Sequence, residues 1–186
     1  MPSSMLHLSV AKKVNPIASF DFYIGNLAPD SNKAKKEITH FYNVPDREIA
    51  LKEFALKAHN NYLKGMLLHL FVDGKWWEKL LSDYAEKEGE GWYSKYDEEN
   101  RKMVSYAFHN TEWAYELWEK MDLCANFDYI ETDCITKENV KLLINRQRKW
   151  LMENKLEPSE IFPPVLIEKF AYDTAKDFSK WLSCTV

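Results

Sequence analysis

Residues 62–73 read Tyr-Leu-Lys-Gly-Met-Leu-Leu-His-Leu-Phe-Val-Asp, an almost wholly apolar run that contains His69 and Asp73. Four residues make about one turn of an α-helix, so the two polar side chains would project from the same face. A carboxylate buried among apolar side chains is strongly disfavoured without a partner, and metal coordination can supply that partner. The run therefore predicts a buried helix that carries part of a polar or metal-binding site.

The same helical spacing of apolar residues continues on both sides of this run. Of the 186 residues, 46% are hydrophobic and 15% are aromatic, which is typical of a folded globular chain. Alternating runs flanked by glycine are scarce. The sequence therefore predicts an all-α protein, a single-domain helical bundle that spans residues 1–186.

Capping residues and prolines set the expected ends of the helices. The apolar run belongs to a central helix over residues 60–88, which Gly74 could interrupt. The other expected elements are a helix capped by Ser4 and ended near Asn15, an ordered loop over 20–29, a short helix over 30–42, a helix capped by Asp46, and helices over 97–121, 136–154 and 164–182.

The net charge, the first residues and the lengths of the apolar runs argue against several classes of protein. The formal net charge is −4, whereas a general nucleic-acid-binding protein would show a basic face or stripe, so no stable nucleic-acid binding is expected. The first residues lack the pattern of a signal peptide, and no run reaches about 18 apolar residues. We therefore expect a soluble, cytoplasmic protein without a transmembrane segment.

Three further side chains join His69 and Asp73 as candidate metal ligands. His7 lies on the inward stripe of the first helix, Asp30 follows a proline at a helix start, and His40 lies near the end of that helix. Each has a structural alternative: a core histidine, a plain N-cap and a helix-end cation, respectively. As a set of oxygen and imidazole ligands they suit zinc, with iron or manganese as alternatives. The set is larger than a closed tetrahedral site needs and contains no thiolate, which favours a catalytic site.

In order and spacing, these motifs resemble the zinc-dependent phospholipase C superfamily, which includes the single-strand nucleases. The motifs are an amino-terminal histidine, a Pro-Asp pair, Thr-His-Phe ten residues later and His-x-x-x-Asp about thirty residues after that, within residues 1–77. The resemblance implies an all-helical fold with a zinc cluster that cleaves phosphate esters. It implies Asp30, His40, His69 and Asp73 as ligands of one zinc, with Asp73 bridging to a second metal that His7 helps to hold. It also implies Asp30 as the general base.

The chain departs from the family pattern after residue 77. Lys79 stands where members with a full cluster have a histidine, and Trp113 stands where a later His-x-x-x-acid pair has its acid. These departures argue against a third zinc. His109 and Glu112 could meet on one helix face as a proton donor or as contacts to a metal ligand, or could form a purely structural surface pair.

The sequence thus predicts a metal-dependent phosphoesterase with one or two metal ions. A metal-activated water would hydrolyse a phosphodiester or phosphomonoester of a small molecule or lipid headgroup. The alternative is a non-catalytic metal-binding scaffold or binding protein of the same fold, which the departures at Lys79 and Trp113 would allow. A phosphohydrolase of the HD type needs an adjacent His-Asp pair, and none of the five histidines is followed by aspartate.

Overall fold

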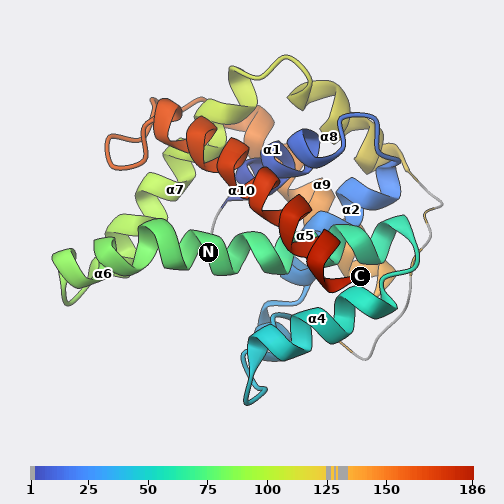
Figure 1. The fold of residues 1–186 in the computed structure, drawn as a ribbon. Helices are drawn as coiled ribbons and strands as arrows, with labels where there is room; N and C mark the ends of the chain where they lie inside the picture. The colour runs from blue at the N-terminus through green and yellow to red at the C-terminus, as the bar shows by residue number, and fades with distance from the viewer. Residues whose placement is uncertain (1–2, 125–126, 128, 130–133) are drawn as a thin grey trace.

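The computed structural model describes residues 3–124, 127, 129 and 134–186 (Figure 1). Within these residues the architecture is all-α, which confirms the predicted fold class. The helices are α1 (Ser4–Val14), α2 (Phe20–Leu27), η1 (Ala28–Ser31), η2 (Lys33–Lys35), α3 (Lys36–Thr39), α4 (Arg47–Lys57), α5 (Asn61–Trp76), η3 (Trp77–Leu81), α6 (Ser82–Glu88), α7 (Trp92–His109), α8 (Ala114–Leu123), α9 (Lys137–Glu153) and α10 (Pro164–Thr185).

Helix α5 contains the apolar run and lies at the centre of the packing. It begins after Asn60, whose side-chain oxygen accepts a hydrogen bond from the Leu63 amide at 2.8 Å. It contacts α1, α2, α4 and α10, and Figure 1 shows α1, α2 and α10 gathered around it. Buried side chains from these helices belong to one hydrophobic cluster, so the site on α5 is embedded in a shared core.

Helix α2 corrects the predicted loop over residues 20–29. Residues 20–27 are helical and pack closely against α5 because each helix has a glycine at the contact. A β-carbon on Gly25 would lie 2.1 Å from the Tyr62 carbonyl oxygen, and one on Gly65 would lie 2.1 Å from the Phe22 carbonyl oxygen. Gly25 therefore serves helix packing here, whereas the sequence interpretation took it as a sign of a loop.

The predicted helix over residues 30–42 is also wrong. This segment consists of the short turns η1 and η2 followed by α3, and Phe41 ends it with a left-handed backbone (φ 57°). Its one large aliphatic residue, Ile38, is 45% exposed, so no apolar stripe holds a longer helix against the core. Thr39 and His40 are buried instead, and their side chains turn toward the site.

Two other predicted helices differ in where they are interrupted. The central helix passes through Gly74 without a break, and its irregular part is the π-helical segment η3 a few residues later. The predicted helix over residues 97–121 is two helices, α7 and α8, because Asn110 closes α7 with a side-chain hydrogen bond to the Tyr106 carbonyl oxygen at 2.8 Å.

The cap of the first helix also differs from the prediction. Helix α1 is capped by Ser3, whose hydroxyl accepts a hydrogen bond from the Leu6 amide, rather than by Ser4.

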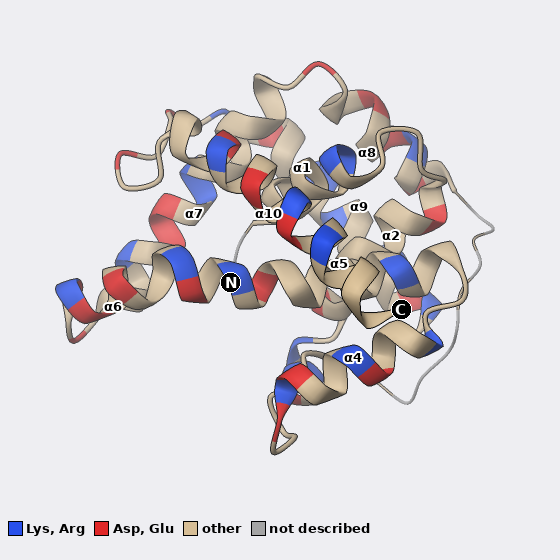
Figure 2. Cartoon of the chain, in the orientation of Figure 1, with Lys and Arg blue, Asp and Glu red and all other residues tan. Residues whose placement is uncertain are grey.

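Charged residues of both signs are interspersed along the helices, as Figure 2 shows for α4, α6, α7 and α10. Lys79 of η3, for example, forms an ion pair of 2.7 Å with Asp177 of α10. None of the helices in the described ranges combines the length and the apolar character needed to cross a bilayer.

Candidate metal centre

The structure brings together all five side chains that the sequence singled out as metal ligands. His7 comes from α1, Asp30 from η1, His40 from the residue after α3, and His69 and Asp73 from one face of α5. The three imidazoles are fully buried, the Asp73 side chain is 1% exposed, and the Asp30 side chain is 23% exposed. Two helices, α1 and α5, and the segment from η1 to the end of α3 thus converge on a polar cluster inside the core.

Four of the side chains direct ligand atoms toward one another around His40. Its Nε2 lies 3.2 Å from His69 Nε2, 3.4 Å from Asp30 Oδ1 and 3.4 Å from Asp73 Oδ2. His69 Nε2 is 3.7 Å from Asp73 Oδ2. Two nitrogen ligands at about 2.0–2.1 Å from a tetrahedral zinc ion are roughly 3.3 Å apart, so these separations suit atoms that share one ion.

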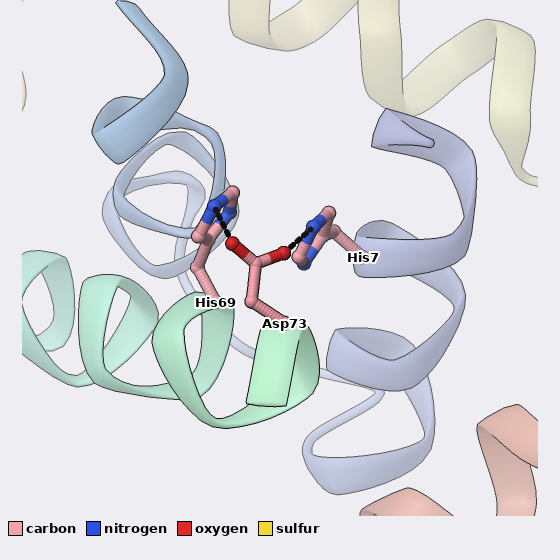
Figure 3. A group of neighbouring side chains, drawn as sticks. All are labelled: His7, His69 and Asp73. Atoms are coloured by element: carbon pink, nitrogen blue, oxygen red, sulfur yellow. Dashed lines mark ion pairs between the residues drawn. The ribbon is translucent and has the colours of Figure 1, made fainter. Parts of the chain in front are cut away.

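Asp73 presents its two oxygens to different partners. Figure 3 shows Oδ1, which lies 3.3 Å from His7 Nε2, and the other oxygen, Oδ2, which faces His69. Oδ2 also lies 3.4 Å from His40 Nε2. The described residues contain two overlapping groups that could hold an ion, His7 with His69 and Asp73, and Asp30 with His40 and His69. A carboxylate in this position can bridge two cations.

Hydrogen bonds to backbone carbonyls fix the protonation of two rings. His69 Nδ1 is 2.7 Å from the Asn26 carbonyl oxygen, and His40 Nδ1 is 3.1 Å from the Lys36 carbonyl oxygen. Because a carbonyl oxygen can only accept, each Nδ1 carries a proton, and Nε2 of each ring is the atom that could coordinate an ion. Burial and the neighbouring His7 lower the pKa of His69 to about 3, so its Nε2 lone pair is free at neutral pH. The Nε2 atoms of His69 and His40 face each other at 3.2 Å, a separation at which both could ligate one cation.

The carboxylates of the cluster are ionised. Burial alone would raise the pKa of Asp73, but the adjacent imidazoles of His69 and His7 outweigh burial and hold this pKa below its usual range. For Asp30, burial is likewise outweighed by the adjacent imidazoles of His40 and His69 and by the ammonium of Lys36, which lower its pKa.

Several buried atoms of the cluster have no hydrogen-bond partner within the described residues. They are both oxygens of Asp73, Oδ1 of Asp30 and both ring nitrogens of His7. Leaving polar groups in a core without hydrogen bonds is costly, and coordination to a cation would satisfy them. On this observation the side chains fit one or two divalent metal ions.

Thr39 positions the ring of His40. Its hydroxyl oxygen is 3.1 Å from the Pro29 carbonyl oxygen and 2.9 Å from His40 Nδ1, so it connects the turn before Asp30 to the imidazole. Groups that orient a ligand in this way contribute to metal affinity without touching the ion.

The variant Thr39→Val tests this role. Valine keeps the shape of the side chain and removes the hydroxyl, so we expect zinc affinity to fall by about tenfold. The measurement is calorimetric titration of chelator-treated protein with zinc. Thr174→Val in α10 is the matched control, because that threonine is also buried and its hydroxyl has no partner among the described residues. Equal zinc affinity for Thr39→Val and the wild type would show that the Thr39 hydroxyl does not contribute to metal binding.

A cavity of about 430 Å³ opens onto Asp73. Tyr42, Arg47, Trp76 and Trp92 line it, and the sequence pattern does not indicate a role for Tyr42 or Arg47. The Arg47 guanidinium donates to the carbonyl oxygens of His40 at 3.0 Å and Leu70 at 2.6 Å and lies over the Tyr42 ring. Arg47 directly follows the cap of α4, where an arginine is unremarkable, so no signal in the sequence distinguishes it.

The structure does not bring His109 and Glu112 to the five-residue cluster. His109 Nε2 lies 3.1 Å from the Leu151 carbonyl oxygen and 3.0 Å from the Asn154 carbonyl oxygen, which joins the end of α7 to the end of α9. Glu112 is exposed in the turn before α8, and neither residue belongs to the groups that could hold an ion. Because α7 ends at His109 and Glu112 lies outside both helices, the two residues do not share one helix face.

The fold and the cluster define the class of site, a buried His/Asp centre in an all-α protein. Comparisons of the chain with family models, curated proteins and solved structures give no significant match. The function must therefore be inferred from the arrangement of the chain's own residues.

Proposed function

We propose that this protein is a zinc-dependent phosphoric ester hydrolase that resembles the phospholipase C superfamily. The observation that carries the proposal is the pair of inward-facing Nε2 atoms of His40 and His69, 3.2 Å apart, beside two ionised carboxylates. A core that served stability alone would gain from apolar side chains at these positions. The same residues and the same bridging position of Asp73 are those that the resemblance implies.

Asp30, His40, His69 and Asp73 would hold one ion, and His7 with the second oxygen of Asp73 would hold another. Oxygen and imidazole ligands without thiolates suit zinc, and iron or manganese would also be accepted. When bound, such ions lower the pKa of a coordinated water and neutralise charge on phosphate oxygens.

Asp30 is the residue best placed to accept a proton during hydrolysis. Its side chain reaches solvent, whereas the other four are buried, and it is kept ionised by the neighbouring imidazole of His40 and by its ion pair with Lys36 at 3.1 Å. The guanidinium of Arg47 lines the cavity beside Asp73, where it can neutralise a phosphate. The volume of that cavity, about 430 Å³, suits a small-molecule or lipid-headgroup ester.

A non-catalytic metal-binding protein of the same fold is the second candidate. It is favoured by Lys79, which pairs with Asp177 at the surface instead of adding a ligand, and by His109, whose ring is used between α7 and α9. Under this alternative the metal would stabilise the core without turnover.

One experiment separates the two candidates. The protein is purified without a metal-chelating tag, its metal content per chain is measured, and hydrolysis of bis(p-nitrophenyl) phosphate and p-nitrophenyl phosphate is followed with and without chelator. We expect at least one metal ion per chain and turnover that the chelator abolishes. Bound metal without chelator-sensitive turnover would instead favour the scaffold.

The variant Asp30→Asn tests the proton acceptor. Because an amide oxygen can still ligate but does not accept the proton, we expect kcat to fall by about a hundredfold. Asp173→Asn in α10 is the control, since that carboxylate lies at the surface and pairs with Lys169. Unchanged kcat in Asp30→Asn would contradict the role of Asp30.

A further inference from the structure

A second cavity, of about 490 Å³, also reaches the metal centre, at Asp30. Its walls come from η1 to α3, from α7 and from α9, and Tyr93 and Trp150 are among the residues that line it. Four cationic side chains surround it, Lys33, Lys36, Arg101 and Arg146, and we call it the basic cavity. The phosphoesterase activity proposed above gives the basic cavity no role.

Within the described residues, two of the four cations have no acidic partner. Lys36 is 3.1 Å from Asp30, and Arg101 Nε is 3.1 Å from Asp97 Oδ2, so these pairs offset one another. Lys33 and Arg146 form no ion pair within the described ranges. In the part of the chain that the structure describes, the basic cavity therefore keeps two positive charges without an ion pair, in a protein whose net charge is −4.

Neutral polar groups in the basic cavity are also free to bind a ligand. Asn100 of α7 and Gln147 of α9 line it, and their side-chain carbonyl oxygens are buried without a hydrogen-bond partner in the described part of the chain. Each amide offers both donors and an acceptor, and its O and N assignments can be interchanged. Ser3 and Ser4 place the start of α1, whose first turn has no acidic residue, at the same cavity. A helix N-terminus favours an anion there.

We propose that the basic cavity binds a second phosphate group of the substrate, one that is not cleaved. This inference rests on the proposed phosphoesterase activity, because Asp30 belongs to both the metal centre and the basic cavity. Two unpaired cations match the charge of a phosphate monoester, which is about −1.5 to −2 at neutral pH. A substrate with two phosphate groups could place one at the metal centre and the other between Lys33 and Arg146. The preferred substrate class is then a small bisphosphate.

The first arm of the test measures binding without metal. Chelator-treated protein is titrated with inorganic phosphate, and the variants Lys33→Gln and Arg146→Gln are compared with the wild type. We expect each variant to bind phosphate about tenfold more weakly, because each loses a charged hydrogen-bond donor. Lys35→Gln and Lys149→Gln are matched controls, since they lie on η2 and α9 but do not line the basic cavity.

The second arm uses the metal-loaded protein and compares p-nitrophenyl phosphate with propane-1,3-diyl bisphosphate. We expect a lower KM for the bisphosphate, and a rise of this KM by about tenfold in Lys33→Gln and Arg146→Gln with unchanged kcat. The KM for p-nitrophenyl phosphate should stay the same in both variants.

The outcomes distinguish the two proposals. Equal phosphate binding by the wild type and both cavity variants overturns the inference, whether or not the protein hydrolyses an ester. Phosphate binding that depends on Lys33 and Arg146, without any preference for the bisphosphate, shows that the cavity takes free phosphate and overturns the substrate assignment. If Lys33→Gln and Arg146→Gln lose phosphate binding and the wild type hydrolyses neither ester, the proposed phosphoesterase activity is overturned, whereas the phosphate site is supported.

Discussion

Replacing Asp73 by asparagine is expected to remove most of the bound metal and, with it, the part of the stability that depends on metal. Asparagine keeps the size of the side chain but loses the charge and one of the two oxygens that face His7, His40 and His69. A ligand at a thousandfold excess over its Kd stabilises a folded protein by about 4 kcal/mol. In a chain of this length that corresponds to roughly 10 °C in Tm.

The measurement is metal content per chain, with Tm recorded before and after a chelator. The wild type should lose roughly 10 °C on chelation, whereas Asp73→Asn should lose little, because it holds little metal to begin with. Asp177→Asn is the control: its side chain is 45% exposed, and its ion pair with Lys79 is a surface contact worth about 1 kcal/mol or less. Full metal content in Asp73→Asn would show that the bridging assignment is wrong.

The cluster could be predicted from the sequence because burying its polar side chains among apolar residues costs free energy unless they have partners. His69 and Asp73 interrupt an apolar helix, and such an interruption is a signal in itself. Tyr42 and Arg47 carry no comparable signal, since an aromatic residue in a loop and an arginine at a helix start are ordinary at a protein surface. Their place at the cavity beside Asp73 depends on how α4 packs against α5, which the local pattern does not contain.

The same reasoning explains which helices the sequence could predict. The helices α4, α9 and α10 begin where the sequence predicts, because caps such as Asp46 and Thr136 act within one turn. Helix α2 was missed because the meaning of Gly25 depends on a residue 37 positions later: the contact with Tyr62 requires a glycine, and a glycine alone indicates a turn equally well. Long-range contacts thus decide what the local pattern leaves ambiguous.

Gly25→Ala and Gly65→Ala should be the most destabilising single substitutions in the contact between α2 and α5. In each case the new β-carbon would lie 2.1 Å from a backbone carbonyl oxygen of the other helix, so whole helices must move apart. We expect a loss of about 3 kcal/mol or more in the free energy of unfolding. Urea unfolding of the chelator-treated protein measures this loss without a contribution from metal.

Gly74→Ala provides the matched control on α5. Its β-carbon would meet a side chain and no backbone, at 2.9 Å from a terminal nitrogen of Arg47, so a few tenths of an ångström of side-chain movement relieves the contact, and alanine is favoured over glycine in a helix by about 1 kcal/mol. We expect its unfolding free energy to stay within about 1 kcal/mol of the wild type. Because the Asn26 carbonyl oxygen on α2 accepts from His69 Nδ1 at 2.7 Å, separating α2 from α5 should also lower zinc affinity in Gly25→Ala. A Gly25→Ala protein as stable as Gly74→Ala, with unchanged zinc affinity, would contradict the close contact that holds His69 in position.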